Sequence, residues 1–227
     1  MEDGNFKYKR SIVTIPILVI FILWVIYFIE IKFGYNFNKY GIYPKRIVGL
    51  RGIIFSPFIH GDAKHLFNNS VPLLVMLISL FYFYRKIALK VLLYGAFLSG
   101  LVTWVIARPS YHIGASGVVY LLVSFVFFSG IIRKYYRLVA LSFAVVFLYG
   151  SMIWYIFPTT DRISWEGHLS GFLTGLLFAV IFRKMGPQPE SFQFSENEEF
   201  DNYFDEDGNF NPPEEESEPL GEGTDKF

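Results

Sequence analysis

The sequence predicts an all-α membrane protein built as a bundle of six transmembrane helices. Hydrophobic residues make up 53% of its 227 residues, and aromatic residues alone make up 20%. Polar or basic residues separate six apolar runs of roughly 20 residues, which is the length that an α-helix needs to cross a bilayer. Apolar residues occupy both alternating positions in these runs, so the strands of an outer-membrane barrel are excluded.

The first span follows a short basic segment. Its apolar run has no small-residue cleavage site behind it, so we expect a retained span and not a removable signal peptide. The six expected spans are Ser11–Ile31, His65–Tyr84, Ile87–Ile106, Gly114–Ile132, Tyr136–Phe157 and Trp165–Phe182.

The connection from Lys32 to Lys64 is the only long one among the expected spans, and it is rich in apolar residues. Loops of such length are usually functional or disordered. An apolar loop beside a membrane packs on the helices or dips into the interface. We therefore expect a long, membrane-associated first loop.

Basic residues predict the orientation. They gather before the first span, between the second and third, between the fourth and fifth, and after the sixth. The positive-inside rule then makes both termini cytoplasmic, in a bacterial inner (plasma) membrane. The six basic residues of the Lys32–Lys64 connection lie on the opposite side and weaken this orientation without reversing it.

The C-terminal segment differs sharply in charge from the rest of the chain. Residues 186–227 hold 14 of the 20 acidic residues and one basic residue, a net charge of −13. Such a segment cannot bury enough apolar surface to fold alone. We therefore expect a cytoplasmic N-terminal segment at 1–10, a membrane domain at 11–184 and an acidic, disordered cytoplasmic tail at 185–227.

Three uses of cysteine and one class of protein gain no support. The chain has no cysteine, which excludes disulfides, zinc–thiolate sites and a cysteine nucleophile. It also has no internal repeat, so an inverted-repeat transporter is not favoured.

Burying a polar residue at membrane depth costs free energy, so each one found there suggests a functional site. His65 and Asn69 open the second span with i, i+4 spacing, which places both on one helical face. Taken alone, this pair is more typical of side chains that hold packed membrane helices together.

Ser116 lies between Gly114 and Gly117 at the start of the fourth span. A serine at a helix start can offer a nucleophilic oxygen and also an N–H group that has no partner within the helix. On this evidence alone, a small-residue packing motif is at least as favoured.

His168 opens the sixth span, three residues before the G-x-x-x-G pair Gly171 and Gly175, which allows close approach of a neighbouring helix. Histidines within membranes usually serve as structural hydrogen-bonders, proton relays or metal ligands. A metal site is disfavoured, because no second ligand lies at ligand spacing and Glu166 faces elsewhere on the helix.

The expected topology joins these clusters. The second, fourth and sixth spans all begin near the non-cytoplasmic face, so His65, Asn69, Ser116 and His168 share one depth. A serine beside a histidine, with donors nearby, provides what acyl transfer needs. Without a carboxylate at that depth we expect a dyad, with His168 oriented by packing against Tyr120, one turn after Ser116.

These residues resemble the rhomboid family in four motifs that occur in the family's order, over roughly residues 11–184. The motifs are His-Gly (His60-Gly61), His-x-x-x-Asn (His65 and Asn69), Gly-x-Ser-Gly (Gly114 to Gly117) and His-x-x-Gly-x-x-x-Gly (His168, Gly171 and Gly175). Each motif alone is common, but their conjunction is specific.

The resemblance implies a rhomboid-like bundle with a water-accessible cavity and an intramembrane serine endopeptidase activity. In this reading Ser116 is the nucleophile and His168 the general base. The Ser116 N–H, His65 and Asn69 hold the oxyanion, and Tyr120 stacks on the catalytic histidine. The implied substrates are single-span membrane proteins, cleaved within or next to their transmembrane segment in the lipid bilayer.

The resemblance implies no metal or other cofactor and no nucleic-acid partner, and it leaves the oligomeric state open. Many family members carry a Trp-Arg pair in the first loop, where this chain has Leu50-Arg51. His112 lies near Ser116 in the sequence, but we assign it to the loop because the family's base comes from the sixth span.

Two rival functions remain. An inactive rhomboid-like protein would bind membrane proteins without cleaving them, although such relatives usually lose the serine or the histidine. A small transporter or channel would place charged residues at mid-membrane depth, whereas the expected span interiors hold none apart from Glu30, near an end.

Overall fold

The computed structural model describes residues 9–148, 154–158, 163–188, 200 and 202–211. Within these residues the chain is helical and contains no β-strand, only two isolated bridges. The prediction of an all-α fold is confirmed. The chain divides into two compact units, Met1–Pro189 and Glu190–Phe227.

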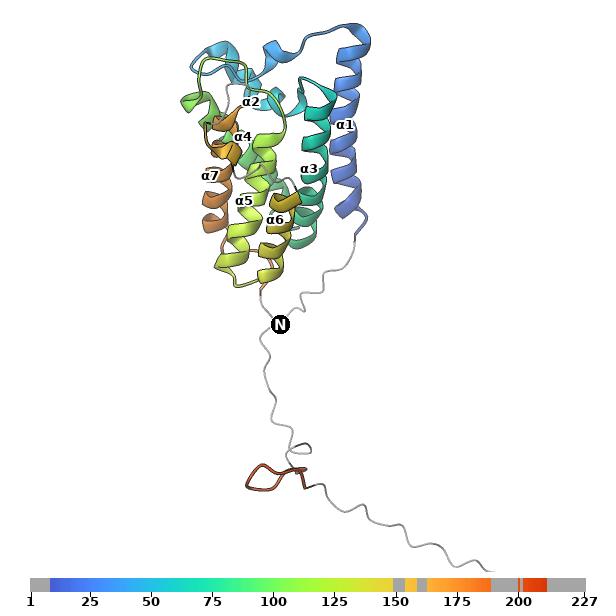
Figure 1. The fold of residues 1–227 in the computed structure, drawn as a ribbon, viewed down its shortest axis with the longest axis vertical. Helices are drawn as coiled ribbons and strands as arrows, with labels where there is room; N and C mark the ends of the chain where they lie inside the picture. Colours follow the sequence, from blue (N-terminus) through green and yellow to red (C-terminus); the bar gives the residue numbers. More distant parts are fainter. Residues whose placement is uncertain (1–8, 149–153, 159–162, 189–199, 201, 212–227) are drawn as a thin grey trace, which may run out of the picture. The chain divides into compact units, whose positions relative to one another are not determined.

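The first unit is a bundle of apolar helices (Figure 1). Its main helices are α1 (Ser11–Phe33), α3 (Ala63–Phe83), α4 (Ala88–Ile106), α5 (Ser116–Ile132), α6 (Tyr136–Leu148) and α7 (Trp165–Ile181). Helices α3, α5 and α7 all begin at the same end of this bundle.

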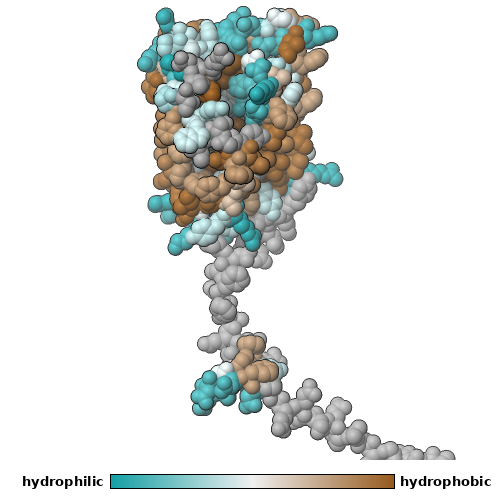
Figure 2. Space-filling model, viewed as in Figure 1, coloured by the Kyte–Doolittle hydropathy of each residue, from teal (hydrophilic) through white to brown (hydrophobic). Residues whose placement is uncertain are grey.

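Three of these helices, α1, α3 and α4, are long and apolar enough to cross a membrane, and α5, α6 and α7 are shorter apolar helices. Figure 2 shows hydrophobic side chains along the sides of the bundle, with hydrophilic side chains gathered toward its ends. This distribution suits a protein whose solvent is lipid along its sides and water at its ends.

The connection between α1 and α3 is folded onto the bundle. It contains η1 (Asn38–Tyr40), η2 (Ile47–Arg51), α2 (Gly52–Phe55) and η3 (Ser56–Phe58). The guanidinium of Arg51 donates to the Lys39 carbonyl at 2.9 Å and lies 4.7 Å from the centre of the Tyr40 ring. A Cβ on Gly52 would clash with the backbone of residues 41–42, so this glycine permits a close crossing of the loop.

Helix α5 lies at the centre of the bundle, packed against α3, α4, α6 and α7. Its residues from Val119 to Val126 are all buried. The closest packing is with α7, where a Cβ on Gly171 would clash with the Gly117 carbonyl oxygen and one on Gly175 with the Leu121 carbonyl oxygen. The G-x-x-x-G pair therefore brings the backbones of α5 and α7 together, as small residues do between membrane helices.

A buried arginine joins the other ends of the same two helices. Arg133 caps α5 and is 5% exposed. Its guanidinium donates to the carbonyls of Phe182 and Met185, just beyond the end of α7. Basic side chains stabilise helix C-termini in this way, because the last carbonyls lack intrahelical partners.

Two predicted helix ends are wrong. The fourth span was expected from Gly114, but Gly114 has φ +106°, outside the helical region, and α5 begins at Ser116. The fifth span was expected to reach Phe157, but the described helix ends at Leu148, and residues 154–156 form the 3₁₀ turn η4 (Trp154–Ile156). Pro158 accounts for part of this difference, because the residue before a proline avoids the α conformation. Residues 149–153 lie outside the described residues.

The second unit contains one described turn, at residues 202–211. The Asp205 carboxylate accepts the backbone N–H of Asp207 at 3.1 Å and that of Asn209 at 2.8 Å, and Phe204 forms a bridge with Phe210. Short-range Asx bonds of this kind define a local turn. The rest of the tail lies outside the described residues.

Candidate active site

Ser116 is the first residue of α5, and the turn before it is held from two sides. Gly114 donates its N–H to the Ser56 carbonyl at 2.9 Å, and Ala115 donates its N–H to His60 Nε2 at 3.3 Å. The positive φ of Gly114 favours glycine there, and a Cβ would lie 2.8 Å from the His65 ring. This turn presents Ser116 at a helix start, where the first N–H groups lack intrahelical acceptors.

His168 lies in the first turns of α7, directly opposite Ser116. Its Nε2 is 2.9 Å from Ser116 Oγ, and its Nδ1 is 2.8 Å from the Tyr155 carbonyl oxygen in η4. A carbonyl oxygen only accepts, so Nδ1 carries the proton and Nε2 is the acceptor for the serine hydroxyl. The ring stacks on Tyr120 at a centroid distance of 4.3 Å and an angle of 15°.

From the sequence, packing alone is expected to orient His168. The Tyr120 stack agrees with that expectation, and the Tyr155 carbonyl adds a hydrogen bond that the sequence did not indicate. A third group that orients the base is the usual requirement of a nucleophile–base pair. Here the backbone of η4 supplies it.

His65 and Asn69 lie on α3 beside the same turn. Asp62 caps this helix by accepting the His65 N–H at 2.7 Å, which fixes the helix start. The Nδ2 atom of Asn69 is buried and has no hydrogen-bond partner among the described residues. Asn69 Nδ2 and the His65 ring both lie within 4 Å of the position that a Cβ on Gly114 would take. The predicted polar residues of α3 and α5 are thus brought together.

His60 lies in the loop before α3 and holds the turn by accepting the Ala115 N–H. It is 2% exposed, and its ring meets that of His65 edge to face at a centroid distance of 5.1 Å. Burial, and secondarily the neighbouring His65, lower the pKa of His60 to about 4. A neutral imidazole at neutral pH is what its role as acceptor for the Ala115 N–H requires.

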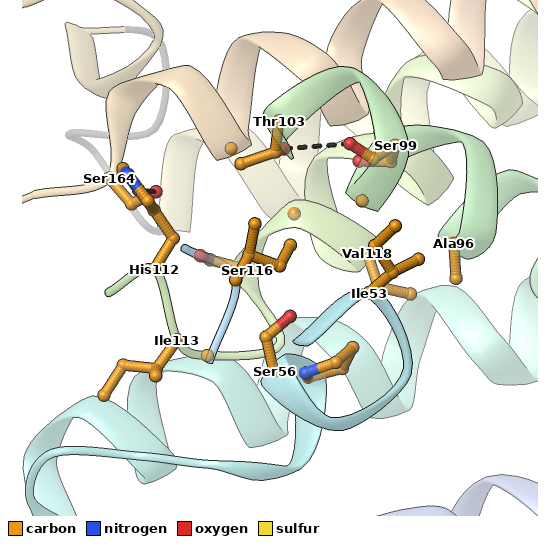
Figure 3. A pocket seen from close by; sticks show the side chains of 16 residues that line it. Ile53, Ser56, Ala96, Ser99, Thr103, His112, Ile113, Ser116, Val118 and Ser164 are labelled. Atoms are coloured by element: carbon orange, nitrogen blue, oxygen red, sulfur yellow. Dashed lines mark hydrogen bonds between the residues drawn. The ribbon is translucent and has the colours of Figure 1, made fainter. Parts of the chain in front are cut away.

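Two cavities adjoin Ser116. The larger has a volume of about 890 Å³, and its lining includes His65, Asn69, Ser116, Tyr120 and His168. The smaller, of about 40 Å³, is also lined by Ser116 (Figure 3). Four hydroxyl-bearing side chains line this smaller cavity besides Ser116: Ser56, Ser99, Thr103 and Ser164. Its volume and polar lining suit a water molecule.

A charged pair near the site was not predicted. Glu166 is 2% exposed at the start of α7, and its carboxylate lies 3.7 Å from Arg108 Nε. From the sequence, no carboxylate is expected at this depth. A carboxylate in the first turn of an expected helix was the available signal, but its partner lies 58 residues away in the sequence.

His112 lies in the loop before α5, as expected. Its ring nitrogens contact Ser164 and Arg108, whereas the Nε2 atom beside Ser116 Oγ belongs to His168. The histidine in hydrogen-bond contact with Ser116 is therefore His168 and not His112.

Comparison with known proteins identifies the family of this chain. The family model described as the rhomboid domain matches residues 49–185, which include every predicted site residue. The chain belongs to the rhomboid family. The match begins within η2 and ends after α7, so helix α1 lies outside it. The rhomboid domain and the apolar helices together identify an integral membrane protein.

Similar proteins occur in mycobacteria. Uncharacterized proteins of Mycobacterium tuberculosis and Mycobacterium bovis are each 32% identical over 172 residues, which cover 70% of this chain and 70% of theirs. An uncharacterized protein of Mycobacterium leprae is 28% identical over 172 residues, which cover 70% of this chain and 67% of that protein.

Proposed function

We propose that this rhomboid-family protein is an intramembrane serine endopeptidase that cleaves single-span membrane proteins within or next to their transmembrane segment. The observation that carries the proposal is the 2.9 Å contact between Ser116 Oγ and His168 Nε2, with the imidazole oriented through Nδ1 by the Tyr155 carbonyl. Acyl transfer needs this combination of nucleophile, base and orienting group.

In the first step Ser116 Oγ attacks the scissile carbonyl carbon, and its proton passes to His168 Nε2. The resulting imidazolium is stabilised by its Nδ1–H bond to Tyr155. It returns the proton to the leaving amine as the C–N bond breaks, which leaves an ester on Ser116. A water molecule then attacks the ester, gives its proton to His168 and regenerates the serine.

The oxyanion formed in both steps needs fixed donors. The Ser116 N–H at the start of α5 and the Asn69 amide are such donors, and His65 lies beside them. The amide of Asn69 is buried without a partner in the described structure, which is costly unless a ligand accepts from it. An oxyanion held there would satisfy that donor in the transition state.

The membrane arrangement follows from the proposed spans. All six apolar helices cross the bilayer, the α1–α3 connection contacts the interface, and both termini are cytoplasmic. The starts of α3, α5 and α7 then face the non-cytoplasmic side, and the cavity of about 890 Å³ admits the substrate segment and water from there.

The test is cleavage of a tagged single-span reporter by the purified full-length protein in liposomes. Ser116→Ala and His168→Ala should each reduce the rate on the order of 10⁶-fold, which leaves no detectable product. Both variants must keep the unfolding temperature of the wild type. A reporter panel that stays intact with folded wild type, or cleavage that survives Ser116→Ala, would favour a protein that binds membrane proteins without cutting them.

A further inference from the structure

Two segments that carry the dyad are joined by side chains outside it. Residues 107–115 lead into Ser116, and residues 163–166 lead into His168. His112 Nδ1 lies 2.6 Å from Ser164 Oγ, and the guanidinium of Arg108 donates to the Ile163 carbonyl at 2.6 Å. We call Arg108, His112, Ser164 and Glu166 the loop–α7 bridge.

The hydrogen bonds of His112 fix its tautomer. Its Nε2 lies 3.0 Å from the Arg108 carbonyl oxygen, which only accepts, so Nε2 carries the proton. Nδ1 is then the acceptor for the Ser164 hydroxyl. His112 is 4% exposed, and its backbone pairs with Ile42 through bonds of 3.0 and 2.9 Å. The ring is therefore held on both sides.

Ser164 is unusual for a residue at a helix start. It is the N-cap of α7, yet its hydroxyl makes no capping bond to the helix. Serine at this position normally accepts an N–H from the first turn. Here the hydroxyl is hydrogen-bonded to His112, and Figure 3 shows the two side chains next to each other.

The other two residues of the bridge, Arg108 and Glu166, form a charged pair. Glu166 Oε1 accepts the backbone N–H of Arg108 at 3.3 Å and lies 3.7 Å from Arg108 Nε. The carboxylate occupies the first turn of α7, where the helix dipole favours negative charge. A pair with one partner 2% exposed interacts more strongly than a surface pair.

The bridge lies close in sequence to each reacting residue: His112 precedes Ser116 by four residues, and Ser164 precedes His168 by four. Farther along the helices, Gly171 and Gly175 set the separation of α5 and α7. We propose that the loop–α7 bridge is a positioning device that sets the register of the α7 start against the α5 start, and so holds His168 Nε2 on Ser116. This proposal rests on the proposed function and assigns the four bridge residues no contact with substrate.

The first test is Ser164→Ala in the full-length protein. The expected result is a roughly 10- to 100-fold lower kcat for reporter cleavage with an unchanged KM, because a misplacement of about 1 Å disturbs the reaction more than binding. Labelling of Ser116 by an alkyl fluorophosphonate should slow by the same factor. Ser164→Thr, which keeps the hydroxyl, should restore both rates.

Ser170→Ala is the matched control. Ser170 is a buried serine on the same helix whose hydroxyl donates to the Glu166 carbonyl at 2.6 Å, within α7. It should keep wild-type kcat. Wild-type labelling and cleavage by Ser164→Ala would overturn the proposal. Equal losses in Ser164→Ala and Ser170→Ala would also overturn it, because they would show a general effect of removing a buried hydroxyl.

A second measurement does not depend on catalysis. The chain has four histidines, so ¹⁵N imidazole spectra can be assigned with single variants. Ser164→Ala should shift the ring signals of both His112 and His168, whereas a purely local contact would shift those of His112 alone and overturn the proposal. If wild type neither labels nor cleaves, the proposed function fails, and the bridge is judged on the His168 signals.

Discussion

Replacing Gly171 by alanine tests the packing that brings the two helices together. Alanine is the better helix former by about 1 kcal/mol, so helix propensity alone predicts a more stable protein. In the structure, however, the new Cβ would meet the Gly117 carbonyl oxygen and would lie 3.1 Å from the Leu121 backbone nitrogen. Backbone atoms cannot turn away as a flexible side chain can, so the sign of the effect should reverse.

The size of the effect follows from the same contact. Carbon and carbonyl oxygen approach to about 3.3 Å at the closest, so α5 and α7 must separate by about 1 Å. Overpacking costs about 3 kcal/mol at the upper end of its range, and the propensity gain of about 1 kcal/mol offsets part of it. We expect a net loss of about 2 kcal/mol.

The same displacement reaches the dyad. The Ser116–His168 contact would lengthen from 2.9 Å to about 3.9 Å, beyond hydrogen-bond range. We expect kcat to fall about 100-fold. The assays are the unfolding free energy in mixed micelles titrated with SDS and the rate of reporter cleavage. Gly61→Ala is the stability control, because its Cβ would meet nothing nearer than Ile113 Cδ1 at 3.9 Å. A Gly171→Ala protein as stable and active as wild type would refute the reasoning.

Three further predictions concern single side chains. Asn69→Ala should lower kcat about 10²- to 10³-fold with little change in unfolding temperature, since Asn69 Nδ2 has no partner among the described residues. Activity equal to that of the wild type would show that Asn69 does not bind the oxyanion. Tyr120→Phe, which keeps the ring stacked on His168, should retain activity, whereas Tyr120→Leu should lose about tenfold in kcat. The pKa of His60 is about 4 in the folded protein and 6.5 in the unfolded chain. The neutral imidazole therefore contributes about 3 kcal/mol to the free energy of unfolding above pH 6.5, and this contribution is lost as the pH falls toward 4. Unfolding temperatures measured across that range should show a shallower slope in His60→Gln, and an identical slope would contradict this assignment.

The features that the sequence predicted well are those with a local signal. Apolar runs bounded by basic residues located the helices to within a few residues at most ends, because hydropathy is read directly along the chain. The polar positions at the starts of three runs predicted that Ser116 and His168 lie close together, and the structure places their side chains in hydrogen-bond contact. Their roles in catalysis stay predictions.

The features that the sequence missed depend on the backbone or on distant pairs. The Tyr155 carbonyl orients His168, but every residue has a carbonyl, so no residue type marks this one. Residues 154–156 form a 3₁₀ turn where a helix was expected, and Pro158 was the local signal, which the apolar composition of the surrounding residues outweighed. Arg133 was counted as a cytoplasmic charge, yet it is buried against the end of α7. A basic residue at a helix end is compatible with either an exposed charge or a buried helix cap.

The charged pair shows where reasoning about membrane depth was too coarse. The expected third span ended before Arg108, the expected sixth span contained Glu166 near its start, and a single sequence does not reveal that residues 58 positions apart meet. The contact between Arg108 and the buried Glu166 accompanies the glycine packing of α5 on α7, which brings the loop before α5 close to the start of α7. The glycines that pack α5 on α7 and the residues of the loop–α7 bridge therefore both affect the distance between Ser116 Oγ and His168 Nε2. A substitution at Gly171 and one at Ser164 should consequently show non-additive effects on kcat, since each one moves His168 away from Ser116.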